Sequence, residues 1–129
     1  MSEILIPVAA GELFDKITIL QIKAERVVDE AKLSNIRCEL NMLNDVASRL
    51  VFSDPQMIVA LQERLKSVNE EIWDAENVVR DHDRRESFGE DFTLVARSTY
   101  RNNDRRAALK RQISVLAGSA ILEEKSHSS

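Results

Sequence analysis

The residues most suited to binding chemistry interrupt an apolar stripe in the C-terminal part of the chain. Between Phe92 and Leu116, apolar residues recur at helical spacing, but the central positions of that stripe are Thr99, Asn102 and Arg106. A guanidinium buried without a partner costs on the order of several kcal/mol. Arg106 must therefore pair with an acid, or this part of the helix must face solvent or a ligand.

Two interpretations of Arg106 remain open. In the first, Arg106 forms an ion pair with an acid of a neighbouring helix, and Glu76 is a candidate. In the second, the guanidinium forks onto the carboxylate or phosphate of an anionic small molecule, while Asn102 and Asn103 supply further hydrogen bonds. The first is favoured because buried polar groups usually find their partners within the protein.

A basic face accompanies the interrupted stripe. Arg97, Arg101 and Arg105 recur every four residues, roughly opposite Thr99 and Asn102 on a helix, so we expect them to point outward. The chain as a whole has a net charge of −4, and few aromatic residues accompany the arginines. This combination argues against nucleic-acid binding.

Two acidic pairs suggest a different chemistry. Glu12 with Asp15, and Glu71 with Asp74, each place two carboxylates on one helical face, where they could hold Mg²⁺ against phosphates. All-helical nucleotide pyrophosphohydrolases use such a plan. The spacing arises easily among 22 acidic residues, however, and one cysteine with two histidines is too few for structural zinc. We therefore expect no metal and no cofactor.

The elements that must position these residues are helices. Apolar periodicity predicts helices over residues 11–28, 29–52, 55–84 and 90–117, and the chain has only three glycines and two prolines for turns. Heptad spacing in the second and third helices indicates coiled-coil packing, with the third helix lying along the second and the fourth. We expect an all-α antiparallel bundle of about four helices with long hairpin arms, forming a single domain over residues 1–129.

The ends of the chain are expected to be less regular. Residues 1–10 contain Pro7 and should form a short extended segment, and residues 119–129 should form a partly ordered tail. No segment approaches the ~20 apolar residues of a membrane span, and no basic stretch precedes the early apolar run as in a signal peptide. We expect a cytoplasmic protein that does not bind membranes. The sustained heptads, with Trp73 beside the stripe, predict a homodimer with Trp73 at its interface.

Two segments carry a family resemblance. The sequences GELFDKITIL at 11–20 and ARSTYR with NDRRAALKR at 96–111 are the most specific, and weaker similarity covers most of the chain. Together they resemble a bacterial family, domain of unknown function 6165. The family has no established activity, so the resemblance implies no catalytic residues and serves only to mark two of the helices.

The resemblance and the periodicity mark the same two helices, the first and the fourth. We expect these helices to face each other and to form one polar site, which contains Glu12, Asp15, Lys16, Asn103 and Arg106. The function favoured is a binding or protein-interaction module with a buried polar network. The alternatives are a Mg²⁺-dependent nucleotide phosphohydrolase and an anion-binding protein.

Overall fold

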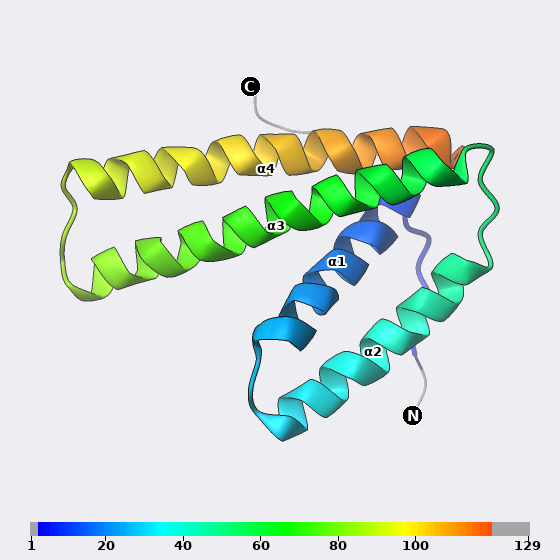
Figure 1. Ribbon diagram of the computed structural model, residues 1–129, viewed down its shortest axis with the longest axis horizontal. Coiled ribbons are helices and arrows are strands. Elements are labelled where there is room, and N and C mark those ends of the chain that lie inside the picture. The colour runs from blue at the N-terminus through cyan, green and yellow to red at the C-terminus, as the bar shows by residue number, and fades with distance from the viewer. Residues whose placement is uncertain (1–2, 120–129) are drawn as a thin grey trace.

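The computed structural model describes residues 3–119, and its regular elements in that range are four α-helices. They are α1 at Ala10–Arg26, α2 at Glu30–Ser48, α3 at Pro55–Arg84 and α4 at Glu90–Leu116 (Figure 1). The all-α class is confirmed, and the predicted bounds are within four residues of those observed. No helix in residues 3–119 is both long and apolar enough to cross a membrane. The predicted tail lies outside the described residues, apart from Ser119.

Two helices begin at aspartates that satisfy free backbone donors. The side chain of Asp29 accepts a hydrogen bond from the backbone N–H of Lys32 at 3.0 Å, and Asp54 accepts one from Met57 at 3.1 Å. Pro55 follows as the first residue of α3, where its fixed φ suits a helix and its missing N–H costs nothing. Local sequence therefore determines where α2 and α3 begin.

Two helices end in a left-handed residue. At the end of α4 this residue is Gly118, with φ 68°. At the end of α3 it is Glu86, with φ 53°, and the N–H of Ser87 donates back to the His82 carbonyl at 2.9 Å. This hydrogen-bond pattern closes a helix, but a side chain at the left-handed position carries a steric cost that glycine avoids.

The helices form two antiparallel hairpins of unequal length. The helices α3 and α4 lie side by side along their whole length, and the shorter pair α1–α2 crosses one half of them (Figure 1). The prediction that α3 packs along α2 is wrong: in the described residues α2 packs only against α1. The reason is that α1 lies between them and contacts all three other helices. The outer half of the α3–α4 hairpin is left as a two-helix arm.

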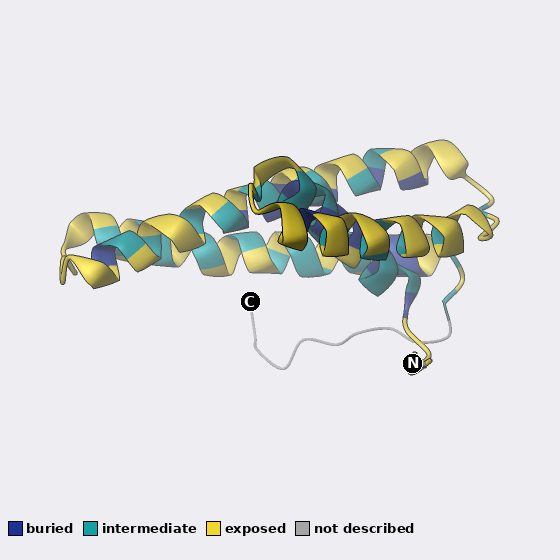
Figure 2. Cartoon of the chain, turned by 90° about the horizontal axis from the view of Figure 1, so that it is seen from below, coloured by how far each residue is buried: buried dark blue, intermediate teal, exposed yellow. Residues whose placement is uncertain are grey.

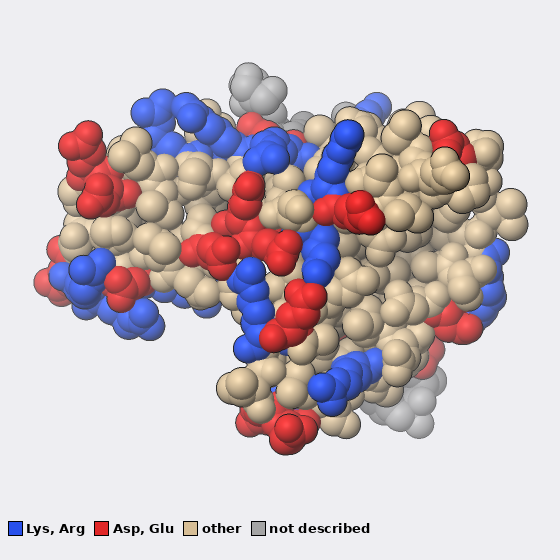
Figure 3. Space-filling view, in the orientation of Figure 1, with Lys and Arg blue, Asp and Glu red and all other residues tan. Residues whose placement is uncertain are grey.

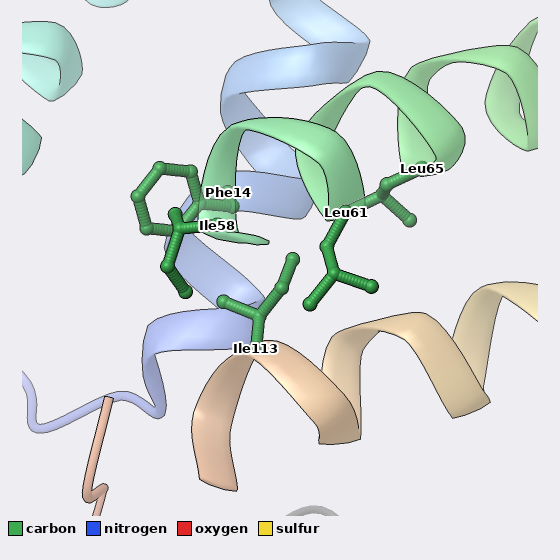
Figure 4. Close-up of a cluster of buried hydrophobic side chains, with 5 residues drawn as sticks. All are labelled: Phe14, Ile58, Leu61, Leu65 and Ile113. Atoms are coloured by element: carbon green, nitrogen blue, oxygen red, sulfur yellow. The ribbon is translucent and has the colours of Figure 1, made fainter. Parts of the chain in front are cut away.

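The core lies where α1 crosses the long hairpin. It brings together side chains from α1, α3 and α4, which are Phe14, Ile58, Leu61, Leu65 and Ile113 (Figure 4). Buried residues concentrate at this crossing, whereas the outer arm is mostly exposed or half-buried (Figure 2). This crossing also fixes the start of α1 against α4, which positions the polar site.

Candidate functional site

An ion pair between Asp15 of α1 and Arg106 of α4 forms the centre of the polar site. The Arg106 Nε donates to Asp15 Oδ1 at 2.8 Å, and Nη2 donates to Oδ2 at 2.5 Å. The Asp15 side chain is 5% exposed and that of Arg106 is 28% exposed. The geometry is bidentate and charge-assisted, which is the strongest arrangement available to this pair of side chains. Of the two interpretations of Arg106, pairing with an acid is the observed one, and the acid is Asp15 rather than the exposed Glu76.

Two buried polar residues complete the surroundings of Asp15. Asn69 of α3, which is 5% exposed, donates through Nδ2 to Asp15 Oδ1 at 3.0 Å and to Thr18 Oγ1 at 2.9 Å. The Thr18 hydroxyl in turn donates to the Asp15 carbonyl at 2.8 Å. The carboxylate thus accepts three hydrogen bonds from α3 and α4, and the network joins three helices at one point.

A second set of contacts fixes the first turn of α1 to the end of α4. The N–H of Gly11 donates to Ser114 Oγ at 2.9 Å, and the N–H of Ala10 donates to Ser119 Oγ at 3.0 Å. A Cβ at Gly11 would lie 2.1 Å from the Lys110 carbonyl oxygen, so only glycine fits this crossing. Ser114 of α4 and Ser119, just after it, therefore act as the N-cap that the Ala9 side chain cannot provide.

The remaining predicted site residues are divided between this site and others. Glu12 belongs to it, because its carboxylate pairs with Lys110 Nζ at 2.5 Å. Lys16 points toward α2 and pairs with Glu39 at 2.9 Å. The side chain of Asn103 donates to the carbonyl of Thr99 in its own helix, at 3.1 Å. Lys16 and Asn103 were thus expected in one site with Asp15, and the structure places them elsewhere because their helical positions face other directions.

Asn102 also lies away from the Asp15 network. Its Oδ1 accepts a hydrogen bond from Arg105 Nη1 at 3.0 Å, on the half-exposed side of α4. Of the predicted ligand-binding residues, Glu12, Asp15 and Arg106 are brought together, whereas Lys16, Asn102 and Asn103 are not.

The second acidic pair contributes to a surface network across three helices. Glu71 pairs with Arg105 of α4 at 2.9 Å, and Asp74 pairs with Arg26 of α1 at 2.7 Å. Figure 3 shows the acidic side chains at the centre of this face with basic ones beside them. Within residues 3–119 no group of three or more acidic, histidine or cysteine side chains is arranged to hold a metal ion. The cations take the place that Mg²⁺ would need at these carboxylates.

Trp73 lies half-buried on α3. The Arg26 guanidinium lies over its ring, 5.8 Å from the ring centroid. This cation–π contact anchors the C-terminal end of α1 to α3. The contact gives Trp73 a role within the chain, and its predicted place in a subunit interface stays a prediction.

The basic face of α4 surrounds a shallow depression of about 320 Å³. Arg97, Arg101 and Arg105 line it, with Ser98 and Leu94, and the three arginines are exposed as predicted. In Figure 3 basic side chains gather over the outer half of α4. Arg105 is neutralised by Glu71, whereas no ion pair is found for Arg97 or Arg101 among the described residues.

Comparison with known proteins adds no family assignment. A scan against protein-family models, a search of curated proteins and a search of solved structures each find no match. The interpretation of the site therefore depends on its geometry alone.

Sequence reasoning missed two members of the buried network, Thr18 and Asn69. Each occupies a core position of its helix: Thr18 lies four residues after Phe14, and Asn69 lies four after Leu65. A polar residue at a core position is the same signal that identified Arg106, so both residues were detectable. What spacing alone does not reveal is that they contact each other directly and both bond to Asp15.

Proposed function

We propose that this chain is a protein-interaction module that functions as a homodimer, in which the Asp15 network is an internal framework. The observation that carries the proposal is a run of aliphatic side chains in the N-terminal segment, where Ile4, Leu5, Ile6 and Val8 are 90%, 88%, 70% and 52% exposed. Covering one such side chain contributes about 1.5–3 kcal/mol. A contiguous apolar patch of this kind is typical of an interaction site.

The polar site supports an internal role. Asp15, Thr18 and Asn69 are buried, and the carboxylate already accepts hydrogen bonds from two other helices. A network that joins α1, α3 and α4 keeps the crossing rigid and so holds the interaction surface in a fixed place. The cytoplasmic location, the coiled-coil character of the long hairpin and membership of domain of unknown function 6165 belong to the same proposal, and they rest on the sequence alone.

Light scattering coupled to size exclusion tests the homodimer directly. We expect a mass near twice 14.7 kDa that decreases toward 14.7 kDa on dilution. A 14.7 kDa species at every concentration would contradict the homodimer.

Anion binding is a second candidate, favoured by Arg97 and Arg101, for which no ion pair is found within residues 3–119. Like charges at positions i and i+4 destabilise a helix by about 0.2–0.5 kcal/mol per pair, and an anion in the depression would relieve that repulsion. Thermal-shift measurements with inorganic phosphate, nucleotides and Mg²⁺ test this. We expect stabilisation by anions that Arg101→Gln reduces and that Arg37→Gln, a change on the exposed side of α2, leaves intact.

The same measurements address the phosphohydrolase alternative. Nucleotide stabilisation that requires Mg²⁺, is lost in Asp15→Ala and is accompanied by phosphate release would support an enzyme. Nothing in the geometry favours it, because the carboxylates of both acidic pairs are engaged by arginine or lysine.

A further inference from the structure

We propose that the N-terminal arm, residues 4–8, of one chain binds in an apolar groove between α3 and α4 of a second copy of the chain. This inference deepens the proposed homodimer and depends on it. It assigns the dimer contact to an exchange of arms, with each chain donating one arm and receiving another.

The arm is an apolar segment with a fixed base. Ala9 is buried, and the backbone donors of Ala10 and Gly11 are held by Ser119, just after α4, and by Ser114 of α4. Residues 4–8, which precede Ala9, are exposed and have no hydrogen bond to the helices within the described part of the chain. Figure 2 shows this segment, in yellow, leaving the bundle beside the start of α1. The arm is therefore fixed at its C-terminal end, and its side chains are free to contact another molecule.

The groove offers the matching apolar surface. It has a volume of about 570 Å³ between the start of α3 and the end of α4, and Leu61 and Ala108 lie in it. Three large side chains around it remain partly exposed: Met57 at 44%, Val115 at 58% and Leu116 at 37%. Gln112 adds a side-chain amide that can donate to or accept from the backbone of an extended segment. An apolar centre with a polar rim is the usual composition of a protein-binding site.

The arm cannot fill the groove of its own chain. At 100° per residue, Ala108, Gln112 and Val115 lie roughly 100–160° around the α4 axis from Ser114, which holds Gly11 in the first turn of α1. An extended chain from Ala9 to Ile4 spans about 17 Å. Following the surface of a helix about 10–12 Å wide through 100–160° requires roughly 9–17 Å of that length. Only the outermost residues of the arm would then reach the near edge of the groove at Val115, and Ile4 alone would reach its far edge at Gln112.

A second copy removes this restriction. Each chain carries one arm and one groove, so a two-fold axis produces two identical contacts and a closed dimer. If the same contact between arm and groove did not close around a two-fold axis, it would produce an open chain of molecules. Light scattering distinguishes that assembly from a dimer by its larger mass.

A matched pair of substitutions tests the arm. Leu5→Asp places a charge in the arm, and Val51→Asp places the same charge at a site of comparable exposure, 93%, in the loop between α2 and α3. We expect Leu5→Asp to raise the dimer Kd about tenfold or more while Val51→Asp changes it by less than about twofold. Helical circular dichroism should stay unchanged in both, because neither residue is in a helix.

Unchanged dimerisation of Leu5→Asp, or equal weakening by both substitutions, would overturn the arm exchange and leave the homodimer itself standing. A parent chain that is monomeric at every concentration would remove both proposals. The two failures are therefore distinguishable.

Crosslinking identifies the groove. In a Cys38→Ser background, which removes the exposed native thiol, Leu5→Cys and Ala108→Cys chains are mixed and treated with a short bis-maleimide. We expect a crosslinked dimer from this mixture and none from Val51→Cys mixed with Ala108→Cys. Equal crosslinking in the two mixtures would overturn the proposal. A chain that carries both Leu5→Cys and Ala108→Cys and closes on itself as a monomer would also overturn it, because the occupant would then be its own arm.

Discussion

Asp15 is the residue at which three helices meet, since Arg106 of α4 and Asn69 of α3 both donate to its carboxylate. We expect Asp15→Ala to lower the free energy of unfolding by about 3–5 kcal/mol, because it leaves the partly buried guanidinium without its acid. Urea denaturation followed by circular dichroism measures this. The control is Asp45→Ala, which removes an exposed pair with Arg49 and should cost less than about 1 kcal/mol. If both substitutions lowered the free energy of unfolding equally, the buried Asp15–Arg106 pair would be no more stabilising than the exposed Asp45–Arg49 pair.

Gly11 is needed for the close crossing of α1 and α4. Gly11→Ala should destabilise the fold by about 2 kcal/mol or more, because the added Cβ would lie 2.1 Å from a backbone oxygen that cannot move independently. Gly89→Ala is the matched control: no atom in the described part of the chain lies within 4 Å of its Cβ position, so it should cost less than about 1 kcal/mol. Thermal unfolding compares the two variants, and similar midpoints would contradict the tight crossing.

At the scale of the elements, the sequence predicted the bounds of each helix closely but did not predict correctly which helices contact each other. Helix ends depend on local signals such as Asp54 followed by Pro55, which spacing and residue type make visible. The neighbours of a helix depend on contacts across the whole chain. The apolar face of α1, which includes the buried residues Phe14, Ile17 and Ile22, is wide enough for neighbouring helices to cover it on more than one side. Because α1 lies between them, α2 and α3 do not contact each other. The periodicity of one helix does not predict which other helices it separates.

The polar site shows the same division between local and long-range information. Arg106 and Asp15 were each recognisable as candidates, Arg106 from the break in its stripe and Asp15 from its acidic pair. Their pairing spans 91 positions in sequence and requires α1 and α4 to cross at Gly11. Glu76 was a reasonable partner only if α3 alone faced Arg106. Residue type thus predicted the members of the site, and the crossing decided which of them meet.

The end of α3 provides a test of backbone strain. Glu86 adopts φ 53°, a left-handed conformation that costs roughly 1 kcal/mol for a residue with a side chain. Glu86→Gly should therefore stabilise the fold by about 0.5–1 kcal/mol in chemical denaturation. Gly118→Ala at the end of α4, where φ is 68° and no atom of the described residues crowds the Cβ position, should have the opposite sign and similar size. A destabilising Glu86→Gly would mean that the glutamate side chain makes a stabilising contact.

At the scale of the whole molecule, the two hairpins differ in how firmly they are held. The core joins α1 to α3 and α4, whereas α2 packs only against α1 within the described residues. The apolar stripe of α2 accordingly stays half-buried at Ile36, Leu40 and Leu43, with only Leu33 fully covered. We therefore expect α2 to detach at a lower free energy than α1, because the free energy of local opening depends on the apolar contacts that are lost.

Native-state hydrogen exchange measures this difference directly. We expect backbone amides of residues 33–47 in α2 to exchange about tenfold or more faster than those of residues 14–22 in α1. Detaching α2 exposes one interface, whereas opening α1 separates three helices and breaks the Asp15–Arg106 pair. The pattern should persist in Leu5→Asp, because the groove proposed for the arm lies on α3 and α4 and leaves α2 uncovered. If α1 and α2 are equally protected in the parent and this equality is lost in Leu5→Asp, the dimer contact would instead lie on the half-buried apolar stripe of α2.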